Sequence, residues 1–330
     1  TKINILSQGR FHMLDLAREL DHTGFDIKFY SFIPTSRCIK FGLQKKCIVS
    51  LFGIIAPFLI LRRIFPKLSW IHIKVQDFIM GIFMRKCDIC ISLTGYVYAP
   101  RIAQKKGAII IMERGSKHIL EQKKILEKNP HKKNEAIPNR NIKCNLKAYQ
   151  FANFISVASQ HVKESFLLHQ YPENRIFVNP YGVDLSMFKP LPNIPKKYDV
   201  IMVGGWGYEK GCDLIVEAIR KTNYSFIHVG SIKDVDFPQE KNFTHIDPVD
   251  QSKLIEYYNQ AKVFILPSRQ DGFGMVLSQA LACNLPIIGS NNCGAPDLKK
   301  MVELPEYITI IKDYTADAIV TAIHTARSEE

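Results

Sequence analysis

The sequence predicts an α/β protein of two doubly wound domains, each with a parallel sheet covered by helices. Its 330 residues exceed what one hydrophobic core usually supports. Apolar strand-like runs alternate with amphipathic helical runs, a pattern typical of parallel sheets. This alternation restarts after a Pro-rich segment at residues 189–195, where the charge balance also changes. We therefore expect one domain over residues 1–190 and another over residues 196–330.

The first domain opens with a strand at 3–6, a polar loop at 7–10, a helix at 11–22 and a strand at 26–31. Further strands are expected at residues 87–93, 108–112, 154–158 and 175–179. Residues 121–147 are rich in Lys, Asn and Glu, contain Pro130 and Pro138 and have no apolar period. We expect this segment to form a charged loop.

The second domain repeats the alternation. Its expected strands are residues 198–203, 226–229, 244–246, 263–267 and 286–290. Its expected helices are residues 211–221, 252–261, 274–282 and 315–327. Ligands of open parallel sheets bind outside the carboxyl ends of the strands, so a cleft between two facing domains is the predicted site.

Charge is distributed unevenly along the chain. Residues 1–195 carry 30 Lys and Arg against 13 Asp and Glu, a balance of +17, whereas residues 196–330 carry 14 against 18, a balance of −4. The basic half is expected to meet an anionic membrane surface, with a solubilising surface as the alternative. Nucleic acid is not expected as a partner, because the sequence has no zinc finger, basic zipper or aromatic-basic RNA-binding pattern.

The expected compartment is the cytoplasm. The eight cysteines have no paired spacing that would indicate a disulfide framework. No leader-like segment precedes the first strand-like run at residues 3–6.

Two segments of the second half carry candidate chemistry. The strand ending at Pro267 runs into the turn Gly272-Phe273-Gly274 and then into a helix, whose free N–H groups favour an anion. Asp271 and Gln279 flank this helix start and are expected to line one pocket; the alternative is a solvated loop acid and an ordinary polar helix residue.

The other segment follows the strand at 198–203 and reads Gly204-Gly205-Trp206-Gly207-Tyr208-Glu209-Lys210-Gly211. It lacks the third glycine of a dinucleotide fingerprint, and the chain contains no P-loop motif.

These segments resemble the family 4 glycosyltransferases, retaining enzymes of the GT-B fold. The matching residues are Pro267-Ser268, Gly272-Phe273-Gly274, Ala280 and Pro286-Ile287, while Asp271 and Gln279 stand where the family has Glu. The resemblance implies that Asp271 contacts the donor hexose and Gln279 the donor ribose. It also implies that backbone amides of the turn and helix start hold the donor, at Gly272, Phe273, Gly274, Met275 and Val276.

In the other segment, the resemblance implies that Lys210 binds the donor diphosphate. Gly205 occupies a donor-binding position at which the family has an Arg. Because one phosphate cation is then missing, Arg10 and Arg269 are candidate substitutes. Val249, in a segment that resembles the family's base-flanking strand and helix start, is a further expected donor contact.

The first half matches the family by architecture more than by motif. Gly9 lies in the loop after the opening strand, which in the family approaches the donor diphosphate. Glu113 stands about where several relatives have a catalytically important His. We therefore expect Glu113 to act with Lys210 and Asp271 in catalysis, on the acceptor side; an ion pair with Arg114 is the alternative.

Residues 47–61 are apolar but interrupted by Gly53 and Pro57, and are followed by Arg62, Arg63, Lys67 and Trp70. The run is shorter than the roughly 20 residues of a spanning helix. It suits a segment that lies among lipid headgroups, or a buried helix beside the cleft.

Together these features predict a retaining glycosyltransferase that moves a sugar from a nucleoside diphosphate donor to a glycan or lipid-linked acceptor in surface polysaccharide synthesis. The enzyme is expected to need neither metal nor cofactor and to sit peripherally at the inner face of the membrane. The alternatives are a GT-B nucleotide-sugar epimerase and a non-catalytic glycan- or membrane-binding relative.

Overall fold

The computed structural model describes residues 1–65, 71–131 and 137–328, and the chain divides into two compact units. The first unit comprises residues 1–114, 138–156 and 172–177, and the second comprises residues 115–137, 157–171 and 178–330. The Pro-rich segment at residues 189–195 lies within the range of the second unit.

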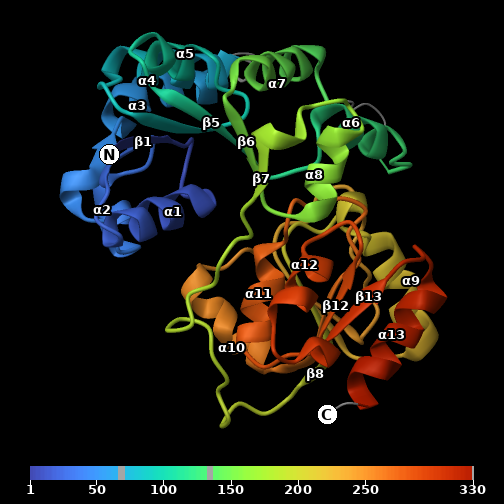
Figure 1. Cartoon of the computed structure of the whole chain (residues 1–330). Coiled ribbons are helices and arrows are strands. Elements are labelled where there is room, and N and C mark those ends of the chain that lie inside the picture. Colours follow the sequence, from blue (N-terminus) through green and yellow to red (C-terminus); the bar gives the residue numbers. More distant parts are fainter. Residues whose placement is uncertain (66–70, 132–136, 329–330) are drawn as a thin grey trace. The chain divides into compact units, whose positions relative to one another are not determined.

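The first unit is built on a seven-stranded sheet of order β3-β2-β1-β4-β5-β6-β7 (Figure 1). The strands are β1 (Lys2–Leu6), β2 (Asp26–Ser31), β3 (Ile48–Ser50), β4 (Ile89–Leu93), β5 (Ile109–Arg114), β6 (Phe154–Val157) and β7 (Ile176–Val178). The helices are α1 (Phe11–His22), α2 (Thr35–Lys40), α3 (Phe52–Ile64), α4 (His72–Phe83), α5 (Tyr98–Lys105) and α7 (Asn139–Phe151). The pairs from β3 through β5 are parallel, and Ile3, Ile5 and Leu6 of β1 are buried, as expected of a sheet covered on both faces.

The expectation of a loop over residues 121–147 is wrong. Most of this segment is helical, in α6 (Ile119–Glu127) and α7, which are separated by residues 132–136 outside the described part. Ile142, Ala148 and Tyr149 of α7 are buried, while Lys and Arg side chains cover its other face. The few apolar residues therefore do recur at helical spacing, but the polar composition hides the pattern.

The apolar segment after β3 forms α3, which continues through Pro57. Ile55 is its one buried residue, whereas Ile60 and Ile64 are 64% and 65% exposed. Exposed apolar side chains also mark α4, which packs beside α5 (Figure 1). They are Ile73, Phe78, Ile82 and Phe83. Helix α3 is thus not a buried helix. Lys67 and Trp70, which follow it in the sequence, lie outside the described residues.

The second unit is built on a six-stranded sheet of order β10-β9-β8-β11-β12-β13, parallel throughout. Its strands are β8 (Tyr198–Val203), β9 (Phe226–Val229), β10 (Phe243–Ile246), β11 (Ala261–Leu266), β12 (Ile287–Ser290) and β13 (Ile308–Ile311). Its helices are α6, α8 (Gln160–Leu167), α9 (Cys212–Thr222), α10 (Leu254–Asn259), α11 (Met275–Ala282), α12 (Ala295–Met301) and α13 (Ala316–Ser328). Helices α9 and α13 pack side by side (Figure 1). Two doubly wound parallel sheets are therefore confirmed.

A histidine at the centre of the second core ties this core to the loop after β8. His228 of β9 and Trp206 are fully buried, with ring centroids 5.0 Å apart. The Nε2–H of His228 donates to the Gly204 carbonyl over 2.8 Å, and its Nδ1 lies 3.0 Å from Nδ1 of His245. Burial lowers the pKa of His228 to about 4, so the imidazole is neutral at physiological pH.

Acidification should destabilise the second unit through this histidine. An unfolded histidine takes up a proton near pH 6.5, whereas folded His228 stays neutral down to about pH 4. Protons therefore favour the unfolded chain as pH falls through this window, and His228 should account for up to about 3 kcal/mol of lost stability. Urea unfolding monitored by Trp206 fluorescence in a Trp70→Phe background should show this loss, and His228→Gln should reduce it. His22→Gln is the control and should keep the pH dependence of the wild-type stability. If His228→Gln keeps it as well, the assignment to His228 is wrong.

Candidate functional site

The loops after β8 and β11 meet at the carboxyl edge of the second sheet. β8 and β11 are parallel neighbours, with Val200 opposite Val263. Backbone hydrogen bonds from the N–H groups of Arg269 and Gln270 to the Glu209 carbonyl, 2.9 and 3.3 Å long, join the two loops. Parallel pairing thus brings both sequence motifs to one place, as strand ends of an open α/β sheet require.

An ion pair links the two motifs. Lys210 ends the 3-10 turn Tyr208–Lys210, and its Nζ lies 2.5 Å from Oδ2 of Asp271. The side chains are 19% and 18% exposed, so the pair faces partly into solvent. Burial opposes the charge on Lys210, but the carboxylates of Asp271 and Glu209 outweigh it and raise the pKa of Lys210. The ammonium group is therefore fully charged at neutral pH.

The Gly-Phe-Gly turn has the expected form. Gly274 is the N-cap of α11 with φ of 78°, a left-handed conformation that favours glycine. Phe273 is buried and packs edge-on against Tyr181, which anchors the turn. A side chain on Gly272 would collide with the Gly115 carbonyl oxygen, which lies directly against the position that a Cβ would take. The turn thus delivers the first N–H groups of α11 to the strand edge.

The other residues of the second unit that were predicted to contact the donor differ in how deeply they are buried. Met275 and Val276 are half-buried in the first turn of α11, and Val249 packs against the second core just after β10. Gln279 is buried, and its Oε1 accepts a hydrogen bond from the Tyr258 hydroxyl over 3.0 Å. One lone pair of that oxygen is thus already used within the protein, and one remains for a second donor.

The two arginines expected as substitute cations each contact other side chains of their own unit. Arg269 is held by a bidentate contact with Asp213 at 2.6 and 2.7 Å, and its guanidinium stacks 3.8 Å above Tyr208. The side chain of Lys233 lies over Gly205. If Gly205 had a Cβ atom, that atom would clash with Cε of Lys233.

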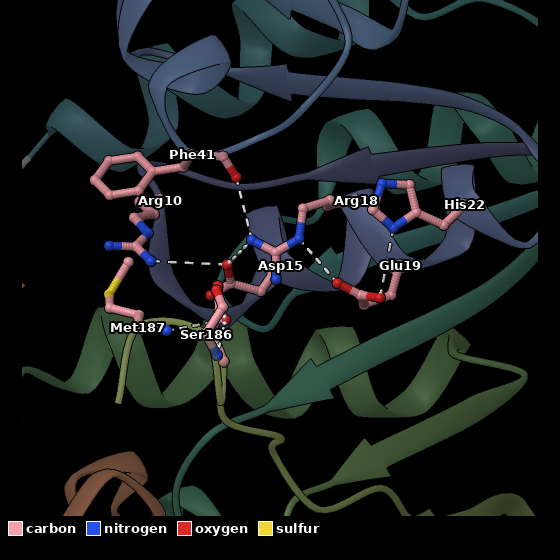
Figure 2. Close-up of polar contacts among 9 residues, drawn as sticks. Arg10, Asp15, Arg18, Glu19, His22, Phe41, Ser186 and Met187 are labelled. Atoms are coloured by element: carbon pink, nitrogen blue, oxygen red, sulfur yellow. Dashed lines mark hydrogen bonds and ion pairs between the residues drawn. The ribbon is translucent and has the colours of Figure 1, made fainter. Parts of the chain in front are cut away.

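Arg10, in the first unit, is also engaged. Its guanidinium lies 3.6 Å above the Phe41 ring and 3.7 Å from Asp15 (Figure 2). Arg18 bonds the same Asp15 carboxylate at 3.0 Å and reaches Glu19 at 2.8 Å. The contact between Arg10 and Asp15 joins the loop that contains Gly9 to helix α1, and Arg18 holds the Asp15 carboxylate in place.

Gly9 and Glu113 both lie at the carboxyl edge of the first sheet, after β1 and at the end of β5. Glu113 is buried, and its Oε1 lies 3.3 Å from Nε2 of His12 at the start of α1. Arg114 donates to Asn145 over 3.2 Å. The structure therefore joins Glu113 to a histidine, a pairing that the sequence did not indicate. The catalytic role of Glu113 remains a prediction.

Three further residues surround the Asp271 loop within the second unit. The Ser159 hydroxyl donates to the Gly272 carbonyl over 2.5 Å, and Lys117 Nζ donates to Asn292 over 2.7 Å. Burial lowers the pKa of His161 to about 4, with nearby Lys117 acting in the same direction. Sequence reasoning missed Lys117 and His161 because they come from the segment after β5 and from α8, and not from the two motifs. The one sequence signal for His161 is its position just after a strand. Ser159 lies in a strand-end segment that itself resembles the family, but the sequence did not indicate its contact with Gly272.

The comparisons with known proteins agree with this geometry. The model of the family "Glycosyl transferases group 1" matches residues 186–330, a range that includes both motifs and the Lys210–Asp271 pair. Over residues 186–330 the chain is similar to the group 1 glycosyl transferases. This result confirms the family resemblance of the motifs.

Among the curated proteins that this chain resembles is a probable sucrose-phosphate synthase of Thermosipho melanesiensis. It is 25% identical to this chain over 178 residues, which are 46% of this chain and 42% of that protein. The chain spans less than half the length of the first curated relatives it matches.

Solved structures extend the fold likeness over the whole chain. A sucrose-phosphate synthase of Thermosynechococcus elongatus has a TM-score of 0.65 at 15% identity and covers 99% of this chain and 91% of that one. An Anabaena protein, HepE, in complex with UDP-glucose has a TM-score of 0.66 at 13% identity, with 99% and 90% covered. At such identities the likeness shows the fold, and the predicted GT-B fold is confirmed.

Within residues 1–65, 71–131 and 137–328, no helix is long and apolar enough to cross a membrane. In the same ranges, no group of three or more His, Cys, Asp or Glu side chains is placed to hold a metal ion.

Replacing Asp271 by Asn should lower the pKa of Lys210. Burial would still oppose the charge on Lys210, whereas the strongest opposing carboxylate would be lost. A pH titration of the Lys210 side chain by NMR with labelled lysine should show the shift. Glu217→Gln, a change on the exposed face of α9, is the matched control and should leave the titration unchanged. An unaltered Lys210 titration in Asp271→Asn would contradict the direct coupling.

Proposed function

We propose that this chain is a retaining glycosyltransferase that transfers a sugar from a nucleoside diphosphate sugar to a glycan or lipid-linked acceptor in surface polysaccharide synthesis. The observation that carries the proposal is the Lys210–Asp271 pair, which lies beside the N-terminus of α11. It joins a cation and backbone N–H groups suited to phosphate with a carboxylate suited to sugar hydroxyls. The UDP-glucose complex of the structural neighbour HepE supports a nucleotide-sugar donor.

In the proposed reaction, the bond between the anomeric carbon and the diphosphate oxygen breaks, and its electron pair leaves with the diphosphate. The acceptor hydroxyl oxygen forms the new bond on the same face, and its proton passes to a leaving-group oxygen. Lys210 and the first N–H groups of α11 stabilise the charge that develops on the diphosphate. Because these groups are already held in place by the loop contacts, little reorganisation is needed during the reaction.

The remaining donor contacts follow from this placement. Asp271 uses Oδ2 for Lys210, and its Oδ1 lies 3.3 Å from the Phe273 N–H, so both oxygens are oriented before a sugar hydroxyl arrives. Gln279 offers the second lone pair of its carbonyl oxygen to a ribose hydroxyl. Val249, near the end of β10, faces the base. Lys210 and the backbone amides supply the phosphate contacts, and the proposal requires neither a metal nor a cofactor.

A thermal-shift panel of UDP-, GDP-, ADP- and dTDP-sugars tests donor binding directly. A ligand present at 100 times its dissociation constant adds about 2.7 kcal/mol of stability, which is readily detected. The proposal requires at least one such donor to raise the melting temperature. Release of a free, epimerised sugar without transfer would favour the nucleotide-sugar epimerase instead.

Lys210→Ala should reduce turnover by about a hundredfold or more, because a preorganised cation at the developing charge would be lost. Release of nucleoside diphosphate from the best donor of the panel measures turnover without knowledge of the acceptor. Lys241→Ala removes an exposed lysine just before β10, at the opposite edge of the sheet, and is the matched control. Turnover of Lys210→Ala equal to that of the control would refute the assignment.

We propose further that the first unit docks on an anionic membrane at the cytoplasmic face through α3 and α4. Both helices expose large apolar side chains, and Arg62 and Arg63 lie in the last turn of α3. Exposed apolar groups beside arginines suit the headgroup region, where the apolar groups enter the interface and the cations meet lipid phosphates. The positive balance of residues 1–195 adds long-range attraction.

Reversal of both arginines should weaken this docking. Because each basic residue near an anionic surface contributes about 1 kcal/mol, Arg62→Glu with Arg63→Glu should reduce binding to anionic vesicles by about tenfold or more. Co-sedimentation with anionic and zwitterionic vesicles measures the effect at two salt concentrations. Lys253→Glu with Lys300→Glu, the same charge change in the second unit, should have little effect. Equal binding to both lipid types would contradict the electrostatic contribution.

A further inference from the structure

The loop after β9 places a lysine at the carboxyl edge of the second sheet, beside the motif that contains Lys210. Trp206 and Ile232 form an isolated parallel bridge. The Trp206 N–H donates to the Ser231 carbonyl over 2.8 Å, and the Lys233 N–H donates to the Trp206 carbonyl over 2.9 Å. The backbone of Lys233 is therefore fixed to the loop after β8.

From this anchor, the Lys233 side chain runs across Gly205. A Cβ built on Gly205 would lie 2.9 Å from the Lys233 Nζ and 3.2 Å from its Cδ, with Cε closer still. Gly205 does not have a positive φ, so its backbone accepts other residues. The space occupied by Lys233, and not the backbone conformation, is what favours glycine here.

The ammonium group of Lys233 is available to an anion. Lys233 is exposed, and within residues 1–65, 71–131 and 137–328 no carboxylate forms an ion pair with it. The adjacent Asp234 is engaged elsewhere, since its Oδ1 accepts the Tyr208 N–H over 3.0 Å and its Oδ2 accepts from Asn129 over 2.7 Å. The ammonium group of Lys233 therefore lies beside the Gly205 end of the segment 205–210, and Lys210 supplies the ammonium group at the other end.

We propose that Lys233 is the second cation for the donor diphosphate, reaching from the loop after β9 into the space left by Gly205. The inference rests on the proposed function and adds to it a contact outside the family motifs. Two lysines at the ends of one loop match a diphosphate, which carries its charge on two linked phosphoryl groups. Lys210 is held by Asp271, whereas among the described residues Lys233 is held through its backbone alone, so its ammonium group can follow the phosphate.

The test compares wild type, Lys233→Ala and the control Lys241→Ala by calorimetry, with the nucleoside diphosphate whose sugar gives the largest thermal shift. Lys233→Ala should weaken binding about tenfold, as expected for loss of a charge-assisted contact. Binding of the parent nucleoside, followed by NMR, should not change. The double variant Lys233→Ala with Gly205→Arg places a cation in the vacated space and should recover affinity for the diphosphate.

The outcomes separate the two proposals. If wild type binds the diphosphate and Lys233→Ala binds it as tightly as Lys241→Ala does, the role of Lys233 is overturned while the proposed function stands. Equal weakening of diphosphate and nucleoside binding would also overturn it, because the effect would not involve phosphate. If wild type binds none of the diphosphates, both proposals fail.

Discussion

The contact on which the candidate site depends is the ion pair between Lys210 and Asp271. It joins two motifs that are 61 positions apart in sequence, and it exists because β8 and β11 are parallel neighbours whose ends face the same edge. Hydrogen bonds from residues 269 and 270 to Glu209 hold the loops around it. The charge of Lys210, the direction of Asp271 and the position of the α11 N-terminus therefore depend on one another.

The surroundings of this pair are rigid on one side and adaptable on the other. Gly274, buried Phe273 and the Ser159–Gly272 hydrogen bond fix the turn before α11. His228 fixes the Gly204 carbonyl from the core below. Lys233, by contrast, extends a flexible side chain over Gly205. Such an arrangement suits a donor whose sugar must be oriented closely while its diphosphate changes charge during the reaction.

The sequence predicted the strands and helices with strong local patterns, such as α1 and α9, and the family of the second half. It missed β3 and β13, which are short edge strands paired with β2 and β12. It also missed α6 and α7, where polar composition hides sparse apolar positions. At the site, motifs identified Lys210 and Asp271 as candidates, but no motif marks Lys233 or His161. These residues reach the site through sheet order and helix packing, which sequence spacing alone does not reveal.

The most direct test of the central claim is a crystal structure of the protein with the nucleoside diphosphate whose sugar gives the largest thermal shift. We predict diphosphate oxygens within about 3 Å of Lys210 Nζ and of the first N–H groups of α11, the usual hydrogen-bond range. A diphosphate bound elsewhere, with Lys210 in contact with Asp271 alone, would contradict it.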